Sequence, residues 1–486
     1  MATSSPVKAL SRFRIKHNHH RHAEPLFLKA RTSNLIIIST VGIAVFTDIF
    51  IYGVIIPIAP FALVQRMGVS SDVVQQNISI AIFVYAAGLL ISSPAVGWLA
   101  DIYQQRRGFM MGGLIALLGS TVMLMLARTY WVFVVGRLVQ GISSGVVWTV
   151  GCALLIDSVP AQDVGKALGL ISSCMNLGTF LGPLLGGVIY ARAGYYAVFG
   201  VVFAIIGIDL TLRVFMLEKK EWYKWHPDDQ EPASVAVTDV GDGDNKKKEK
   251  KTSTGVILLK EYRIINGLFL VTLCGWILTG LETTLPIHVE DLFEFNSLGA
   301  GLIFLPIALT SLIAPLIGWW VDRKGSRLPL ALGFLLSCPF LVLLRLPNHN
   351  AVSQVVLMCA MLALLGICIS ALLPAAMAEI SKSVETVEQR TPGIFGKGGA
   401  NGQAFGLLNM AFSAGSVFGP LEAGFVANQH GFNTASWTLG LIGGVASIPA
   451  FLFVGGVVKR GKKKNLAGNQ QSAASALNQA HDEIEL

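Results

Sequence analysis

Four of the few charged side chains inside long apolar segments of this chain are candidates for chemistry, because ionic groups are unusual there. They are Asp48, Arg137, Glu282 and Glu422. A charge in mid-membrane costs on the order of 3 kcal/mol on insertion scales, so such residues are the first candidates for function. A carboxyl group in this setting can take up and release a proton, whereas an arginine keeps its charge and requires a partner. These residue types predict proton chemistry inside a membrane.

Asp48 lies near the middle of the apolar block 34–62, and Arg137 lies in the outer half of the block 130–156. We predict that they pair, and that protonation of Asp48 leaves Arg137 unpaired and favours another conformation. A purely structural ion pair is the alternative. Glu282, four residues before Pro286, is predicted to face the same cavity as Asp48. Glu422 has two alternative predicted locations: the wall of the cavity, or the outer interface of the membrane.

Five further polar or aromatic side chains in apolar blocks are candidates for the wall of such a cavity, although each also fits simple packing or hydrogen bonding between helices. They are Tyr52, Gln140, Trp148, Asn176 and Asn409. The sequence has no Gly-x-x-x-x-Gly-Lys loop for nucleotide phosphates and no catalytic triad or metal-ligand pattern. We therefore predict no enzyme activity, no cofactor and no metal.

A charged motif occurs twice. Gly97-Trp-Leu-Ala-Asp101 and Gly318-Trp-Trp-Val-Asp322 are related by a shift of 318 − 97 = 221, and the same shift carries Arg106 onto Arg327. Charge pairs at helix ends can clamp one conformation of a bundle and break in another. The predicted gating residues are Asp101, Arg106, Asp322, Arg323 and Arg327.

A second repeat consists of glycines, and carries Gly165 onto Gly402 with a shift of 402 − 165 = 237. Glycines four residues apart strip one helix face of side chains, so a neighbouring helix can approach closely. We predict that these helices seal the contact between two halves of the protein, with ordinary close packing as the alternative. The residues concerned in the first copy are Gly178, Gly182, Pro183, Gly186 and Gly187.

Composition indicates the class of fold. Of 486 residues, 53% are hydrophobic and only 14% are charged, against about 25% charged in a soluble domain. The apolar residues form blocks of about 20 or more, the length of a membrane-spanning helix. We predict an all-α integral membrane protein with twelve transmembrane helices in two pseudo-symmetric six-helix bundles. The blocks are 34–62, 78–100, 108–127, 130–156, 166–191, 195–217, 264–289, 298–320, 328–346, 351–378, 402–427 and 434–458.

The net charge of +8 is explained by where lysine and arginine lie. They concentrate in the ends of the chain and its centre, so both termini are predicted to be cytoplasmic, and nucleic acid is not an expected partner. A loop is expected over 380–401, and Asn77 opens a glycosylation sequon. The expected divisions are a tail at 1–33, a six-helix bundle at 34–217, a linker at 218–261, a second bundle at 262–458 and a tail at 459–486.

Over about residues 34–460, these motifs resemble the major facilitator superfamily. Gly97–Arg107 and Gly318–Arg327 resemble its loop 2–3 signature and the echo in loop 8–9, although Ile102 and Gln104 depart from the usual basic residue and glycine. Arg137-Leu-Val-Gln140-Gly141 resembles the family's arginine motif of the fourth span.

The segment Gly178–Gly187 closely resembles the motif that marks antiporters of this family, and Asp48 with Pro57 looks like the drug:proton antiporter branch. Within that branch, the chain is similar to vesicular-amine-transporter-like proteins and fungal metabolite exporters. Those amine transporters carry acids in spans 1, 7, 10 and 11, whereas Ile369 and Asn409 stand at the last two positions here. This departure favours a neutral or anionic substrate over an amine.

The resemblance implies a monomeric secondary transporter in the lipid bilayer of the cell membrane, or of a vacuole or vesicle. We predict proton-coupled antiport that exports a small organic molecule, such as a secondary metabolite, toxin or drug-like compound, by alternating access. An exporter of organic acids such as dicarboxylates is the alternative. A receptor that binds ligand without moving it is a second one.

Overall fold

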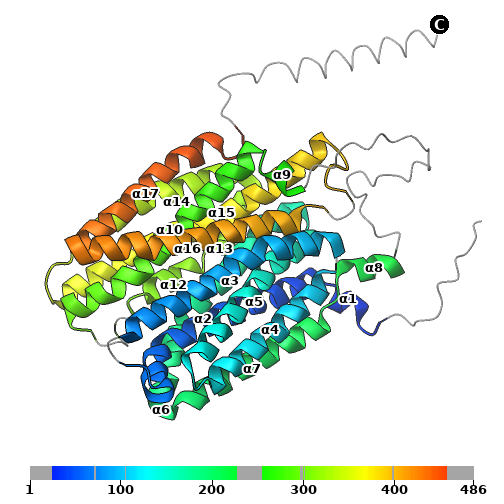
Figure 1. Cartoon of the computed structure of the whole chain (residues 1–486). Coiled ribbons are helices and arrows are strands. Elements are labelled where there is room, and N and C mark those ends of the chain that lie inside the picture. The colour runs from blue at the N-terminus through cyan, green and yellow to red at the C-terminus, as the bar shows by residue number, and fades with distance from the viewer. Residues whose placement is uncertain are drawn as a thin grey trace, which may run out of the picture.

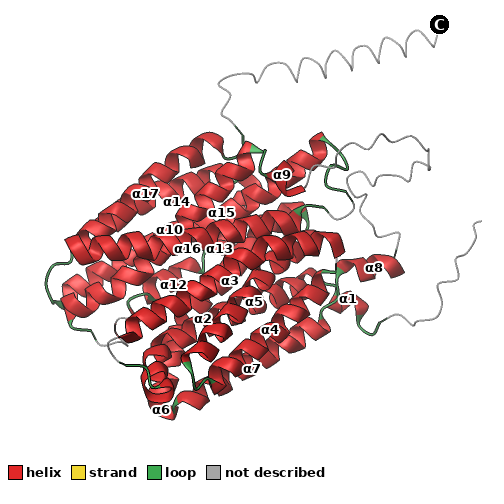
Figure 2. Ribbon diagram, in the orientation of Figure 1, coloured by secondary structure: helices red, strands yellow, loops and turns green. Residues whose placement is uncertain are grey.

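The structure is a computed structural model in which the described residues form helices and no strand (Figure 2). The predicted tail up to residue 24, the central segment 227–253 and the tail from residue 457 lie outside the described residues. Described are residues 25–70, 73–103, 105–226, 254–295, 299, 302–396 and 399–456.

Long helices follow one another along the chain. In the first half of the sequence they are α2 (Asn34–Met67), α3 (Val74–Tyr103), α4 (Arg106–Leu126), α5 (Tyr130–Ser158), α6 (Val164–Ala193) and α7 (Tyr195–Phe215), with short α1 (Leu28–Arg31), η4 (Ala161–Asp163) and α8 (Lys219–Trp225). In the second half they are α10 (Tyr262–Phe293), α12 (Leu305–Ser311), α13 (Ala314–Lys324), α14 (Arg327–Leu343), α15 (Val352–Arg390), α16 (Asn401–His430) and α17 (Phe432–Phe453), with short α9 (Thr254–Leu258).

Eleven helical segments in the described part of the chain are long and apolar enough to cross a membrane. The segment α12–α13 counts as one of them, and α14 is apolar but shorter, with 17 residues. A lipid-exposed backbone must satisfy its own hydrogen bonds, which a helix does. The protein is therefore an all-helical, multi-pass membrane protein, as its composition predicts.

One predicted span has an internal break, and one predicted loop is wrong. The block 298–320 corresponds to a single membrane-crossing segment, Leu305–Lys324, which breaks between α12 and α13, because Pro315 has no N–H to donate to the carbonyl of Ser311. The hydroxyl of Ser173 approaches that carbonyl oxygen at 3.5 Å instead. The expected loop 380–401 is helical as far as Arg390, since its apolar residues recur at helical spacing and are buried in α15.

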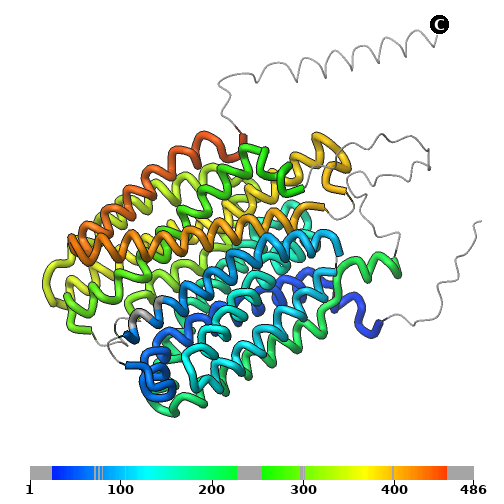
Figure 3. Tube along the Cα trace, in the orientation of Figure 1, coloured from blue at the N-terminus to red at the C-terminus, as the bar shows by residue number. Residues whose placement is uncertain are grey.

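The helices of the two halves of the sequence gather separately (Figures 1 and 3). Helices α2–α7 occupy the lower part of the view, and α10, α14, α15, α16 and α17 the upper part. The most extensive contacts between long helices of one half join α2 to α6 and α10 to α16, while α3 packs on α16 and α6 on α13 across the two halves. These two crossing contacts position the site described below.

The glycines of α6 serve two different contacts. Gly178, Gly182 and Gly186 lie against α2, where a Cβ atom on any of them would stand 2.7–3.0 Å from a carbonyl oxygen. Those oxygens belong to Phe46, Phe50 and Val54. The predicted seal between halves is thus not made by this string, whose spacing instead lets two helices of the same half touch.

The two halves contact each other through glycines near the N-terminal ends of α6 and α16. A Cβ atom on Gly165 would lie 2.6 Å from the carbonyl oxygen of Gly318, and one on Gly402 would lie 2.7 Å from that of Gly97. The charged motif of the first half, at Gly97, therefore contacts the glycine motif of the second half, at Gly402. The charged motif of the second half, at Gly318, contacts the glycine motif of the first half, at Gly165.

We expect Gly182→Ala to lower the stability of the protein, because its methyl group has no room beside the Phe50 carbonyl. Overpacking of this kind costs about 1–3 kcal/mol. Thermal unfolding of the purified protein measures the effect. Gly187→Ala is the matched control, since no atom lies within 4 Å of its added methyl group. Equal unfolding temperatures for the two variants would contradict the packing described for α6.

Candidate functional site

Asp48 is completely buried within α2 and is the centre of a polar cluster. The hydroxyl of Ser144, on α5, donates a hydrogen bond to its Oδ2 atom. The other carboxylate oxygen, Oδ1, is buried with no hydrogen-bond partner among the described residues. Trp148, one turn further along α5, approaches the same carboxylate. A carboxyl group held this way is shielded from water and poorly solvated by the protein.

Arg137 lies next to this carboxyl but contacts aromatic rings. Its guanidinium carbon stands 5.0 Å from the ring centre of Tyr52 and 4.9 Å from that of Tyr85, and these two rings lie 4.7 Å apart. Its Nη1 atom donates to Gln140 Oε1 over 2.8 Å. The Tyr85 hydroxyl is 2.8 Å from Ser144 Oγ. The cation is thus stabilised by two π faces and an amide.

The predicted ion pair between Asp48 and Arg137 is not formed: within the described residues, Arg137 makes no ion pair at all. The hydroxyls of Ser144 and Tyr85 link the carboxylate to the aromatic ring over which the guanidinium lies. Sequence reasoning missed both residues. The signal was available for Ser144, which lies seven residues, or two helical turns, from Arg137 on α5.

The two acidic candidates of the second half, Glu282 and Glu422, have different surroundings. Glu282 on α10 is half-buried and close enough to the Tyr52 hydroxyl to interact with it electrostatically. Glu422 on α16 accepts a hydrogen bond from Trp276 Nε1 at 3.4 Å, within the second half. Glu282 therefore approaches the Arg137 cluster from the opposite half, while Glu422 joins α16 to α10.

The two asparagines among the cavity candidates are both buried. Asn409 on α16 donates to Ser93 Oγ on α3 at 2.7 Å, so it holds the two halves together. Asn176 lies within α6. The other asparagine of interest, Asn77, lies in the first turn of α3, and its glycosylation stays a prediction.

A buried ion pair that sequence reasoning missed lies on α7. Arg213 and Asp209 are fully buried and joined by two hydrogen bonds of 2.7 Å, and Arg213 also donates to the carbonyl oxygen of Met110. The signal was the i, i+4 spacing of opposite charges near the end of an apolar block. Both groups interact electrostatically with Asp48.

A cluster of hydrogen bonds joins α3 to α16 at the first predicted gate. Asp101 lies in the last turn of α3, and its carboxylate accepts from the backbone N–H groups of Gly402 and Gln403 at 2.9 and 2.8 Å. These N–H groups belong to the first turn of α16, where the helix dipole favours an anion. Arg106 donates to Asp101 at 2.8 Å and to Asp157 at 3.2 Å. The charge pair predicted for this motif is present.

The second copy makes the same contact with α6. Asp322, near the end of α13, accepts from the N–H groups of Gly165 and Lys166 at 2.7 and 2.9 Å. The predicted pair with Arg327 is not formed, because that guanidinium donates to the carbonyl oxygen of Val454 at 2.6 Å. Arg323 lies over the Trp319 ring, 4.2 Å from its centre. The two gates share a helix-capping aspartate but differ in their arginine.

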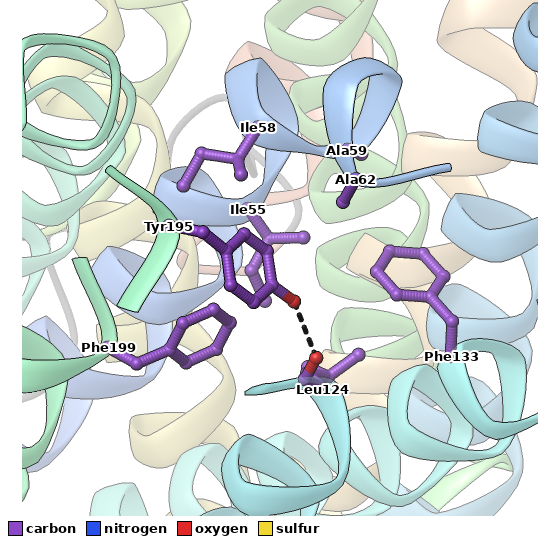
Figure 4. Close-up of a pocket in the computed structure, with 8 residues that line it drawn as sticks. All are labelled: Ile55, Ile58, Ala59, Ala62, Leu124, Phe133, Tyr195 and Phe199. Carbon is purple, nitrogen blue, oxygen red and sulfur yellow. Dashed lines mark hydrogen bonds between the residues drawn. The ribbon is translucent and has the colours of Figure 1, made fainter. Parts of the chain in front are cut away.

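A separate pocket lies among α2, α4, α5 and α7 (Figure 4). Its lining is apolar, and the one hydrogen bond drawn runs from the Tyr195 hydroxyl to the carbonyl oxygen of Leu124, 2.7 Å away. The hydroxyl of Tyr195 is already bonded to that backbone carbonyl, the other lining side chains are apolar, and helices of the first half alone form the pocket. The lining residues are Ile55, Ile58, Ala59, Ala62, Leu124, Phe133, Tyr195 and Phe199.

A membrane bundle with crosswise helix contacts, two matching aspartate–helix contacts and a buried acid is typical of membrane transport proteins as a class. The family model of the Major Facilitator Superfamily matches residues 41–391 and 309–481. The chain belongs to the major facilitator superfamily, and it resembles the drug:proton antiporter branch of that family.

Similar proteins include an uncharacterized MFS-type transporter of Schizosaccharomyces pombe, which is 36% identical over 436 residues and covers 87% of this chain and 97% of its own. A class C tetracycline resistance protein of Escherichia coli is 24% identical over 87% of this chain and 97% of its own. Among solved structures, the human organic anion transporter MFSD10 has the same fold, with a TM-score of 0.63 at 17% identity, covering 86% of this chain and 99% of its own.

We expect Asp101→Asn to loosen the N-terminus of α16 more than Asp322→Asn loosens that of α6. Asp101 is also one of the two anionic partners of the buried Arg106, so its loss removes part of a buried charge pair in addition to the helix-end anion, whereas an anion at a helix N-terminus alone contributes about 1 kcal/mol. Hydrogen–deuterium exchange of peptides covering the start of each helix measures both effects, and each variant is the control for the other. Unchanged exchange in Asp101→Asn would contradict the gate.

Proposed function

We propose that this protein is a secondary active transporter that exports a small organic molecule in exchange for protons. The observation that carries the proposal is the buried carboxyl of Asp48, joined through hydroxyl groups to a cluster that reaches Glu282 of the other half. A buried acid is costly in a membrane, and loading and releasing a proton gives it a function. Alternating access is the motion that would expose it to each side in turn.

In this proposal, twelve membrane-spanning helices form two six-helix bundles, 34–217 and 262–458. The shorter helix α14 is counted as a span in addition to the eleven longer segments. A linker at 218–261 joins them, and it begins and ends in the short helices α8 and α9. The gates at Asp101 and Asp322 hold one end of the bundles together. The arginine- and lysine-rich segments α1 and α8 lie at the right-hand end of the view in Figure 1, and we assign that end, with both termini, to the cytoplasm.

Arg137 bears on the class of substrate. Because it makes no ion pair to the described residues, a carboxylate of the substrate is a fitting counter-ion. This favours an organic-acid exporter as the second candidate beside an exporter of metabolites, toxins or drug-like compounds. The solved relative with the same fold is named as an organic anion transporter, and another relative as a tetracycline resistance protein.

A receptor that moves nothing is the remaining alternative. Two gates with equivalent helix-capping aspartates are of use to a protein that opens and closes, and a sensor has no need of both. We further propose that the protein acts as a monomer in the cell membrane, with a vacuolar or vesicle membrane as the alternative.

The test uses the full chain in proteoliposomes that contain a pH-sensitive dye, with an imposed pH gradient and a panel of metabolites, amines and carboxylic acids. Collapse of the gradient by one class of compound, only in vesicles with protein, supports antiport and identifies that class. Saturation and counterflow separate a carrier from a receptor. Equilibration of labelled compounds without any proton movement would contradict the proposal.

We expect Asp48→Asn to abolish transport against a substrate gradient while substrate exchange continues, because the amide cannot carry the proton. Efflux driven by the pH gradient and exchange at constant pH are measured in the same vesicles. Asp291→Asn is the matched control, since this exposed acid lies at the end of α10 and outside the cluster. Normal uphill transport by Asp48→Asn would refute the assigned role of this residue.

A further inference from the structure

Asp48 has no direct route to water in the described part of the chain. Its side chain and that of Ser144 have no exposed surface, whereas Tyr85 keeps 6% of its surface exposed. A proton that reaches Asp48 must therefore pass through neighbouring groups. The hydroxyls of Ser144 and Tyr85 form a continuous hydrogen-bonded chain to the carboxylate, and its outer member is the more exposed one.

We infer that Tyr85 and Ser144 form a proton relay that loads Asp48 and reports its protonation state to Arg137. The inference rests on the proposed function and deepens it, since it assigns two residues of α3 and α5 to the coupling step. Neither residue belongs to the set that the sequence motifs single out. Each would itself carry the proton in transit to Asp48, because its hydroxyl both accepts and donates within the hydrogen-bonded series.

The transfer balances in protons. A hydronium ion at the cluster gives one proton to the Tyr85 oxygen, the phenolic proton of Tyr85 moves to Ser144 Oγ, and the Ser144 proton moves to Asp48 Oδ2. Three O–H bonds form and three break. The net change is one neutral carboxyl group on Asp48 and one water molecule, while the two hydroxyls are restored.

The same proton transfer reverses the direction of both hydrogen bonds in the series Tyr85–Ser144–Asp48. With Asp48 charged, Ser144 must donate to the carboxylate and therefore accepts from Tyr85. With Asp48 neutral, the carboxyl donates to Ser144, Ser144 donates to Tyr85, and the phenolic O–H is free to donate elsewhere. Because the Tyr85 ring lies under the Arg137 guanidinium, the protonation state reaches that cation without an ion pair.

Other charged or titratable groups lie around the Asp48 carboxyl but do not belong to the hydrogen-bonded series. On α7, Asp209 and Arg213 satisfy each other through two hydrogen bonds. On α6, the thiol of Cys174 packs against α2 near Gly42. On α5, Arg137 lies over the rings of Tyr52 and Tyr85. Trp148 on α5 also approaches the carboxylate, but its indole N–H can only donate and passes no proton on. Among the described residues, the route made of hydroxyl groups runs through Ser144.

The experiment measures proton transfer itself, without a substrate. Time-resolved infrared spectroscopy follows the carboxyl band of Asp48 after a pH jump, with the full chain in lipid nanodiscs and the band assigned by its loss in Asp48→Asn. We expect Tyr85→Phe and Ser144→Ala each to slow the appearance of this band at least tenfold. Tyr85→Phe keeps the ring and its contact with Arg137, so a structural role alone would not change the rate.

Two matched controls keep the result interpretable. Tyr195→Phe removes a phenolic hydroxyl that donates to a backbone carbonyl, and Ser143→Ala removes a buried hydroxyl that donates to the carbonyl of Gly113. Both should protonate Asp48 at the wild-type rate. Wild-type rates in Tyr85→Phe and Ser144→Ala would overturn the relay and leave the proposed function standing. A band that never titrates would refute the proton role of Asp48 and the relay together.

Discussion

The hydrocarbon core of a bilayer has no water to solvate a charge, and the arrangement of this protein follows from that constraint. Arg213 is neutralised by Asp209 and also donates to a carbonyl oxygen, and Arg137 lies against a pair of tyrosine rings. Asp48 alone among these groups is left with a carboxylate oxygen that has no hydrogen-bond partner in the described residues. The least satisfied group is the one whose charge is easiest to remove by protonation, which is why it carries the proposed chemistry.

Unpaired N–H groups at helix ends explain the two contacts predicted to act as gates. The first N–H groups of a helix have no partner within the helix, and an aspartate from the other half of the sequence supplies one. Asp101 caps α16 and Asp322 caps α6, and close glycine contacts bring the backbones near enough. In the proposed transport cycle, opening this end would separate each carboxylate from the helix whose N–H groups it accepts from.

Sequence reasoning found the helical class, the repeats and the buried acids because each leaves a local signal. Hydropathy blocks and glycine spacing depend only on neighbours along the chain. It could not find that Arg327 contacts a carbonyl instead of Asp322, nor that Tyr85 stands between Asp48 and Arg137. Those contacts depend on how helices rotate against one another, which a single sequence does not encode locally. The α15 boundary is a different case, since buried apolar residues recur at helical spacing there as far as Val387, and this local signal was overlooked among charged neighbours.

The central claim is that proton movement and substrate movement are coupled through Asp48. The most direct measurement is the substrate gradient at which net flux stops in proteoliposomes under a series of imposed pH gradients. If the claim is right, this balance point shifts in proportion to the pH gradient, because each transported molecule is exchanged for a fixed number of protons. A balance point that stays at equal substrate concentrations, whatever the pH gradient, would contradict the account.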